Sequence, residues 1–387
     1  MTHVQIDEPI VPGREGADWG VDPDSGAVVV RLTSAPAMNS NIYCEQPYAS
    51  PDGRRFLIAR TFDPFGASHQ LFVADLQTLG ITQIEPDVPQ ELVAHTSWGE
   101  WAYYLMHDGS VRRLSLMTLK REAALPAGSL GGDVIIESIT PDNRLLIGYE
   151  PAGDGSFRSF TCDTHTGEKR IYCQGPSNRN PHAQADLSGA RRVLHQLVTA
   201  DDRQVIVLVI DLASGEQTTL PLGGRWSAQS SGHMAWIADT GRVACALDWR
   251  RADRAHDPRH PQGNLAICAP GDAQPTIFTA PEHGFYHVSV SRCGRYFVCD
   301  DFMDMKNDAF SSGPAGPVRI VVGNLQTGKY RTLLRDCQAY GIAGSSRFEP
   351  DPYFTADNRH VIYNASPFGL MQVFAARVPE AFLASLD

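Results

Sequence analysis

The segment Tyr48–Ala59, YASPDGRRFLIA, contains the pattern that decides the fold of this chain. Its Ser-Pro-Asp-Gly core predicts a tight turn, because proline presets φ and glycine accepts a positive φ. The apolar run after the turn predicts a β-strand. The same order recurs in TSWGEWAYYLMH from Thr96, SITPDNRLLIGY from Ser138, ADLSGARRVLHQ from Ala185, WIADTGRVACAL from Trp236, SVSRCGRYFVCD from Ser289 and YFTADNRHVIYN from Tyr353.

Each of these seven units continues into a further strand and a second turn. Examples are LFVADLQTLG, FTCDTHTGEK and VRIVVGNLQTGK, in which the turn residues predict a hairpin to a fourth strand. Four strands per unit, repeated without helical periodicity, are typical of a propeller blade. We therefore predict an all-β fold, a single domain over residues 1–387 that forms a seven-bladed β-propeller.

The two ends of the sequence predict how the ring closes. The stretch Asp24–Ser34, DSGAVVVRLTS, resembles the end of a unit whose beginning is missing, and the last unit stops after its third strand. We expect the strand Ala27–Leu32 to complete the last blade and close the ring, which removes exposed sheet edges. Only Pro379–Asp387 has a helical pattern.

Composition excludes some classes of partner. The formal net charge is −11 and the isoelectric point is near 5.6, which argues against nucleic acid or an anionic membrane as the main partner. No apolar run reaches the ~20 residues of a membrane span, and the first residues lack a secretory signal pattern. The eight cysteines are scattered through strand-like runs. We expect buried free thiols and a cytoplasmic location, or a periplasmic one if a leader has been removed.

A common register places polar residues in the channel of the predicted ring. The residue six positions before the Asp position of each turn should lie at one height, because the first strand of each blade lines the channel. Units one, four, five, six and seven place polar residues there, whereas units two and three place Val93 and Ile136. The polar residues are Gln46, His182, His233, His287 and Asp351. A polar arc at a channel mouth favours a ligand site, although each residue could instead be a hydrogen-bonded channel residue.

Two of these units, the sixth and the seventh, suggest a metal site. One imidazole, His287, and two carboxylates, Glu349 and Asp351, can hold a divalent cation. Glu349 and Asp351 alternate about Pro350, so we expect them to face the same way in an extended strand. The alternative is that these carboxylates cap a turn or pair with Arg347.

Further candidates have catalytic or binding chemistry. His233 suits a general base, with a channel hydrogen bond as the alternative. His182 is a second catalytic candidate. Arg203 could bind a substrate carboxylate or pair with Asp201 or Asp202. Gln46, His195 and Arg347 are candidate substrate-binding residues. The insertion at residues 249–263 is either a solvated loop or a lid.

Four stretches in the same order resemble the oligogalacturonate lyases, which are seven-bladed propellers that break short pectin fragments by β-elimination. They are DSGAVVVRLTS, SGHMAWIADTG (Ser231–Gly241), YHVSVSRCG (Tyr286–Gly294) and the segment Glu349–Phe382. The resemblance covers nearly the whole chain, and the order of the histidine-bearing units is its most specific part.

The resemblance implies roles for individual residues. His233 matches the family's catalytic base, His287 matches a Mn²⁺ ligand, and Arg203 is nearest to the arginine that neutralises the substrate carboxylate. The last blade departs from the family pattern, because Ser346, Glu349 and Asp351 stand where the family has Gln, His and His. The family's His-Arg pair is also absent from NSNIYCEQ, residues 39–46. A different metal, a different substrate and a lost activity therefore stay open.

We therefore expect a lyase that cleaves a uronate-containing oligosaccharide by metal-assisted β-elimination, with Mn²⁺ as the implied cation and Ca²⁺ or Mg²⁺ as alternatives. His233 would take the C5 proton of the uronate, and a cation with an arginine would stabilise charge on the adjacent carboxylate. The alternatives are a non-catalytic glycan-binding or TolB-like scaffold propeller and a metal-dependent glycan hydrolase.

Overall fold

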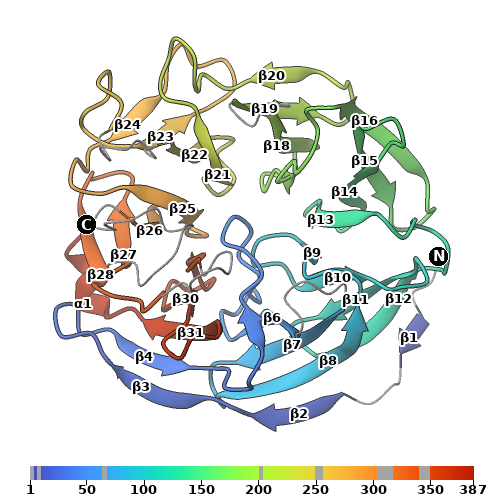
Figure 1. Ribbon diagram of the computed structural model, residues 1–387, viewed down its shortest axis with the longest axis horizontal. Coiled ribbons are helices and arrows are strands. Elements are labelled where there is room, and N and C mark those ends of the chain that lie inside the picture. Colours follow the sequence, from blue (N-terminus) through green and yellow to red (C-terminus); the bar gives the residue numbers. More distant parts are fainter. Residues whose placement is uncertain are drawn as a thin grey trace.

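The structure, a computed structural model, describes residues 4–6, 10–62, 68–199, 204–248, 256–302, 317–339 and 349–387. In this part of the chain, antiparallel strands form sheets arranged around a central axis, and the first strands of the sheets lie nearest the centre (Figure 1). The one helix there is short, α1 (Glu380–Ala384). The predictions of an all-β fold and of a propeller are confirmed.

The strands follow the repeated units of the sequence. The first unit forms β5 (Met38–Ser40), β6 (Arg55–Thr61), β7 (His69–Asp75) and β8 (Gly80–Val88). The second forms β9 (Ala94–His95), β10 (Trp101–Leu105), β11 (Val111–Ser115) and β12 (Arg121–Leu125). The third forms β13 (Ile135–Ile139), β14 (Leu145–Pro151), β15 (Phe157–Asp163) and β16 (Lys169–Gly175).

The later units continue the same order. The fourth forms β17 (Gln184–Ala185), β18 (Arg192–Val198), β19 (Val205–Asp211) and β20 (Gln217–Thr219). The fifth forms β21 (Ser230–Trp236), β22 (Val243–Leu247), β23 (Leu265–Cys268) and β24 (Thr276–Phe278). The sixth forms β25 (Phe285–Val290), β26 (Tyr296–Asp301), β27 (Arg319–Asn324) and β28 (Tyr330–Leu334). The last forms β29 (Tyr353–Phe354), β30 (His360–Ala365) and β31 (Gln372–Arg377).

The N-terminal strands lie along the outside of the molecule (Figure 1). β4 (Val28–Arg31), within the strand predicted to complete the last blade, pairs antiparallel with β31. β3 (Ala17–Val21), β2 (Val11–Arg14) and β1 (Val4–Ile6) then pair with β4, β8 and β12. The number of blades stays a prediction, because β9 and β13 join two of the units in one nine-stranded sheet.

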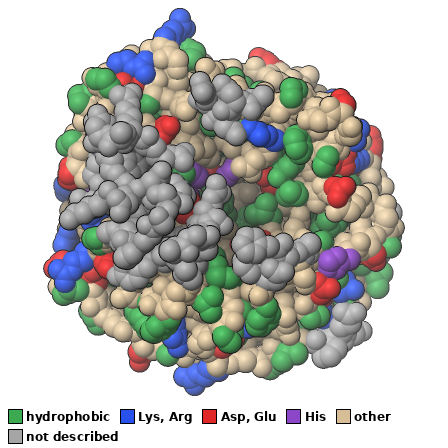
Figure 2. All heavy atoms as spheres, in the orientation of Figure 1, with side chains coloured by type: hydrophobic (Ala, Val, Ile, Leu, Met, Phe, Trp, Pro, Cys, Tyr) green, Lys and Arg blue, Asp and Glu red, His purple; other side chains and the backbone are tan. Residues whose placement is uncertain are grey.

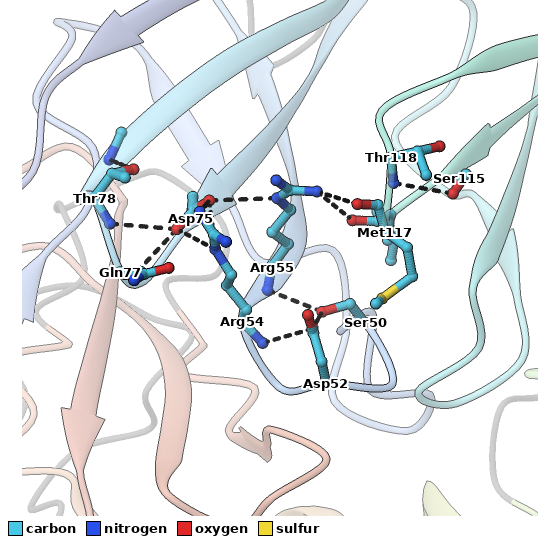
Figure 3. Close-up of polar contacts among 12 residues, drawn as sticks. Ser50, Asp52, Arg54, Arg55, Asp75, Gln77, Thr78, Ser115, Met117 and Thr118 are labelled. Atoms are coloured by element: carbon cyan, nitrogen blue, oxygen red, sulfur yellow. Dashed lines mark hydrogen bonds and ion pairs between the residues drawn. The ribbon is translucent and has the colours of Figure 1, made fainter.

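The Ser-Pro-Asp-Gly turn at residues 50–53 is held by its own side chains (Figure 3). The Asp52 carboxylate accepts hydrogen bonds from the Ser50 hydroxyl and the Arg54 amide, and the Ser50 hydroxyl accepts one from the Arg55 amide. Gly53 adopts φ +72°, a conformation that favours glycine. The Arg55 guanidinium donates to the Met117 carbonyl oxygen at 2.6 Å, which ties this turn to the next unit.

The cysteines and the C-terminal segment behave as the sequence predicted. All eight cysteines are free thiols, and seven are buried. Phe382 of α1 is buried, and the Leu386 carbonyl accepts a hydrogen bond from the Asn324 amide group, so the end of the chain packs against the sixth unit. No helix among the described residues is long and apolar enough to cross a membrane.

Candidate functional site

A cavity of about 460 Å³ lies where the inner strands meet. Its ionisable lining consists of Tyr43, Glu45, Tyr48, Glu91, Glu137, His182, His233, Tyr286 and Glu349. Figure 2 shows histidine side chains at the centre of this face of the molecule. These residues come from every part of the chain between the first unit and the last. The propeller therefore gathers groups that are remote in sequence into one polar cavity, which we call the central cavity.

Local irregularities in three inner strands aim titratable side chains at the centre. The pairing of β13 with β14 shifts between Ile136 and Ser138, which leaves Glu137 outside the regular ladder. The corresponding shifts in β21 and β25 contain His233 and His287. A β-bulge redirects the side chain of its extra residue, and such bulges are enriched next to active sites.

His287 lies between three carboxylates. Its Nδ1 is 2.6 Å from Asp300 Oδ2, and its Nε2 is 3.6 Å from Glu349 Oε2 and 3.5 Å from Asp351 Oδ1. Burial opposes the charged imidazole, but Asp300, Asp351 and Glu349 together raise the pKa of His287 to about 10. The structure therefore brings together the three residues proposed from the sequence as metal ligands.

The backbone conformation that brings Glu349 and Asp351 to His287 differs from the predicted extended strand. Asp351 has φ +46°, in the left-handed region, so Glu349 and Asp351 do not follow the alternation of an extended strand. Two buried asparagines hold this segment instead. Asn41 donates to the Asp351 carbonyl oxygen at 2.7 Å, and Asn364 donates to the Glu349 carbonyl oxygen at 3.2 Å.

The donor atoms around His287 Nε2 are suited to a divalent cation. His287 Nε2 and Asp351 Oδ1 are buried and have no hydrogen-bond partner. Three carboxylates face one imidazole, so a cation of charge +2 would neutralise most of the negative charge of the cluster. Donor atoms ~2.1 Å from one ion lie ~3 Å apart when they are at right angles. Among the described residues, no group of three or more His, Cys, Asp and Glu residues has a geometry that could hold a metal ion. The 3.5 and 3.6 Å separations at His287 Nε2 are wider than the spacing of ligands on one ion.

The Ser231 hydroxyl oxygen lies 3.0 Å from the Ala246 carbonyl oxygen and 3.1 Å from His233 Nδ1. With the hydroxyl hydrogen donated to Ala246, the Ser231 oxygen accepts from His233 Nδ1–H, and Nε2 is then the basic nitrogen of the neutral ring. The His233 ring contacts His287 at 4.3 Å and Tyr286 at 4.2 Å between ring centroids.

A second histidine of the central cavity is paired with a carboxylate. His182 Nδ1 lies 3.1 Å from Glu45 Oε2. The Gln184 amide group and the Met234 amide also donate to Glu45, at 3.0 and 3.1 Å. Burial acts to lower the pKa of His182, but Glu45 and Glu137 outweigh it, and the pKa is raised.

Glu137 is buried beside His182, and its carboxylate accepts a hydrogen bond from the Ala183 amide at 3.1 Å. Burial raises the pKa of Glu137 from 4.5 to about 7. The proton is therefore bound more tightly in the folded state than in the unfolded state. The contribution of this group to stability is complete below pH 4.5 and is lost as the pH rises to about 7.

Glu137→Gln is expected to raise the free energy of unfolding at pH 8 by up to about 3 kcal/mol, from a pKa shift of about 2.5 units. The glutamine carbonyl can still accept from the Ala183 amide, and the buried charge is gone. Guanidinium unfolding at pH 5 and pH 8 measures the effect. Glu168→Gln, on an exposed turn, is the control. The same loss of stability with pH in wild type and Glu137→Gln would contradict the prediction.

The structure places the other sequence-predicted residues as follows. Gln46 lines the central cavity and donates to the Glu137 carbonyl oxygen at 3.0 Å. His195 is buried in β18, where its Nε2 lies 2.6 Å from Asn178 Oδ1 and its ring packs on Tyr172. It is not among the residues that line the cavity. Arg203 and Arg347 lie outside the described residues, as does Ser346.

The second and third units were predicted to place only apolar residues in the channel, and this prediction is incomplete. Val93 and Ile136 are buried apolar residues, as expected. The central cavity nevertheless receives Glu91 and Glu137 from the second and third units. The sequence analysis did not identify Tyr43 and Glu45, which also line the cavity. Residues two positions apart in an extended segment face the same side, so their spacing in NSNIYCEQ could have indicated that they lie together.

The described end of the predicted lid, residues 256–263, packs against its own blade. Arg259 pairs with Asp257 at 2.7 Å and donates to the Gly224 carbonyl oxygen at 2.7 Å. His260 Nε2 lies 2.8 Å from the Trp226 carbonyl oxygen. The rest of the insertion, residues 249–255, lies outside the described residues, and the lid stays a prediction.

Comparison with solved structures finds the same fold in two oligogalacturonate lyases. One, in complex with manganese, is 17% identical with a TM-score of 0.70, over 97% of this chain and 99% of that chain. The other, from Vibrio parahaemolyticus, is 16% identical with a TM-score of 0.68, over 97% of this chain and 100% of that chain.

More distant propellers are similar as well. The β-propeller domain of the trilobed protease from Pyrococcus furiosus is 10% identical with a TM-score of 0.52, over 88% of this chain and 95% of that chain. No protein-family model matches the sequence, and no curated protein matches it. At identities this low, the structural similarity shows a shared fold and nothing finer. The resemblance to oligogalacturonate lyases indicated by the sequence motifs is supported as a similarity of fold.

Proposed function

From the resemblance to oligogalacturonate lyases and the ionisable groups of the central cavity, we propose that this protein is a lyase that cleaves a uronate-containing oligosaccharide by metal-assisted β-elimination. The observation that carries the proposal is the position of His233 beside His287. A histidine with a defined basic nitrogen lies next to a cluster suited to a divalent cation. Elimination from a uronate needs both groups at adjacent atoms of the sugar.

Each residue of this cluster has a separate task in the proposed reaction. Nε2 of His233 takes the C5 proton, and Ser231 keeps the ring in the required tautomer. His287, Glu349 and Asp351 would hold the cation, and Asp300 would fix the orientation of His287 through Nδ1. A cation bound there would stabilise the charge that develops on the uronate carboxylate. We propose Mn²⁺, because the similar lyase binds manganese; Ca²⁺ and Mg²⁺ also suit carboxylate ligands.

The acidic lining of the central cavity is compatible with an anionic sugar only if part of its charge is neutralised. Burial raises the pKa of Glu91 and brings that of Glu137 to about 7, so partial protonation of Glu137 removes negative charge near neutrality. His182, with its raised pKa, adds positive charge. Arg203 is proposed, by the resemblance, to contribute a second cation. We also propose that the ring has seven blades, closed by β4 on the last one, and that the protein acts in the cytoplasm.

The test is direct. The protein is incubated with Mn²⁺ and a panel of galacturonate, glucuronate, mannuronate and guluronate oligosaccharides, and the ultraviolet absorbance of the unsaturated uronate is followed. A rising absorbance with at least one oligosaccharide, abolished by a chelator, is the expected result. No absorbance change across the panel, from folded protein that binds the metal, would overturn the proposal.

Product masses separate the alternatives. Elimination leaves the summed mass of the products equal to that of the substrate, whereas hydrolysis adds one water. Masses increased by water would identify a metal-dependent glycan hydrolase. Oligosaccharide binding without any product would identify a glycan-binding or scaffold propeller.

A further inference from the structure

His182 and Glu45 form a buried histidine–carboxylate pair in the central cavity. Glu45 reaches His182 from a segment 137 residues earlier in the chain. The Gln184 and Met234 donors satisfy the same carboxylate, so Glu45 is held in one orientation. A carboxylate fixed in this way orients an imidazole and stabilises its protonated form.

The backbone around this pair is held in unusual conformations. His182 has φ +47°, and Ile42, which precedes Tyr43 and Glu45, has φ +75°. A positive φ is a genuine outlier for a β-branched residue such as isoleucine. Strain of this kind persists where the surroundings over-determine it, and it is concentrated at functional sites. Here it occurs on both sides of the contact between His182 and Glu45.

The groups that face His182 come from several elements. Glu45 and Tyr43 approach from the first unit, Glu137 from β13 and His233 from β21, and His287 of β25 acts to lower the pKa of His182. The Asn180 side-chain amide lies 3.0 Å from His182 Nε2, and a proton on Nε2 requires the amide orientation in which Asn180 Oδ1 accepts it. The two carboxylates favour the imidazolium, whereas His233 is held by the Ser231 hydroxyl. The pairing with the Glu45 carboxylate suits His182 to donate a proton.

We propose that His182, oriented by Glu45, is the acid that protonates the leaving sugar oxygen. This inference rests on the proposed elimination reaction. His182 and His233 both line the central cavity, with ring centroids 6.3 Å apart, so each can reach one of two neighbouring atoms of a bound uronate. Tyr43, with its ring 5.4 Å from that of His182 and 6.3 Å from that of His233, lies against both rings.

The proton balance of the step is complete. His233 Nε2 takes the C5 proton, the C5–H electron pair forms the C4–C5 double bond, and the C4–O bond breaks. The leaving oxygen takes the proton of His182 Nε2. His233 then loses its proton to water, and His182 regains one, so each turnover returns both residues to their starting states. Glu137, buried beside His182, has the proton affinity to exchange with it near neutral pH.

The first experiment compares leaving groups. In His182→Asn, asparagine tolerates the left-handed conformation and can still donate to Glu45, but it has no acidic proton. On an oligosaccharide, whose leaving alkoxide needs a proton, kcat is expected to fall by about 10²–10⁴-fold. On the corresponding 4-O-nitrophenyl uronate, whose leaving group departs without a proton, the loss is expected to stay within tenfold. Equal losses on the two substrates would overturn the acid role.

The second experiment does not depend on turnover. The pKa of His182 is measured by NMR titration of the imidazole, with the signal assigned from its absence in His182→Asn. The wild-type value is expected above the ordinary value of about 6.5, and Glu45→Gln is expected to lower it. A wild-type pKa below 6.5, or one that Glu45→Gln leaves unchanged, would overturn the inference. Wild-type protein that eliminates neither substrate would instead overturn the proposed function, whatever the titration gives.

Discussion

Replacement of His233 by glutamine is expected to lower kcat on a uronate oligosaccharide by about 10²–10⁴-fold, the usual contribution of a positioned general base. Glutamine can retain a hydrogen bond to Ser231, but its amide cannot take a proton. Because the proposed role of His233 is proton transfer and not substrate binding, KM is expected to change much less than kcat. Initial rates from ultraviolet absorbance give kcat and KM, and calorimetry with the oligosaccharide measures binding.

His195→Gln is the matched control for this prediction. His195 is also a buried histidine with one hydrogen-bonded ring nitrogen, but it lies in β18 and does not line the central cavity. Its replacement is expected to leave kcat nearly unchanged. If His195→Gln reduced kcat as strongly as His233→Gln, the effect would be one of packing, and the base would have to be another group.

The repeated turns could be predicted from the sequence because their determinants are local. Asp52 and Gly53 lie within one turn and fix its conformation by themselves. The pairing of β4 with β31 was also predictable, because an incomplete last unit and an unpaired early strand complement each other. The turns follow from local residues and the pairing of β4 with β31 from a count of strands, and neither prediction needs knowledge of side-chain packing.

The common register of the units predicted His233 and His287 correctly, but in the third unit it predicted Ile136, whereas Glu137 lines the central cavity. The difference is one residue, and it comes from a β-bulge in the pairing of β13 and β14. A bulge is set by how two strands share hydrogen bonds, which the sequence of one strand does not encode. Counting six residues back from the turn therefore finds the residue that faces the cavity only where the bulge places that residue at the counted position.

The pair of His182 and Glu45 shows a different limit of the sequence. The two residues are separated by 137 positions, and their contact depends on the left-handed conformations of His182 and Ile42. Local patterns carry no information about contacts between distant units. Asp300 is an intermediate case, because it lies opposite His287 across the hairpin of β25 and β26. A predicted hairpin could have suggested that contact.

A cation bound at the proposed site is expected to stabilise the folded chain. Mn²⁺ at 100 times its Kd is expected to raise the free energy of unfolding by about 2.7 kcal/mol, because the ion binds the folded chain and not the unfolded one. The double variant Glu349→Gln, Asp351→Asn is expected to lose this stabilisation, since both oxygen donors beside His287 Nε2 lose their charge. Thermal unfolding and calorimetry with Mn²⁺ measure the effect without reference to catalysis.

Two further variants make this prediction specific. Asp300→Asn keeps the three proposed ligands but weakens the hold on His287 Nδ1, so it is expected to reduce Mn²⁺ affinity by about 10–100-fold. Glu85→Gln is the control, because Glu85 is also a buried carboxylate, but it pairs with Arg121 in another part of the ring. Its loss is expected to lower stability while leaving the Mn²⁺-dependent increase intact. If the double variant kept the full stabilisation by Mn²⁺, the cation would have to bind elsewhere. The charge cluster at His287 would then be a set of ion pairs.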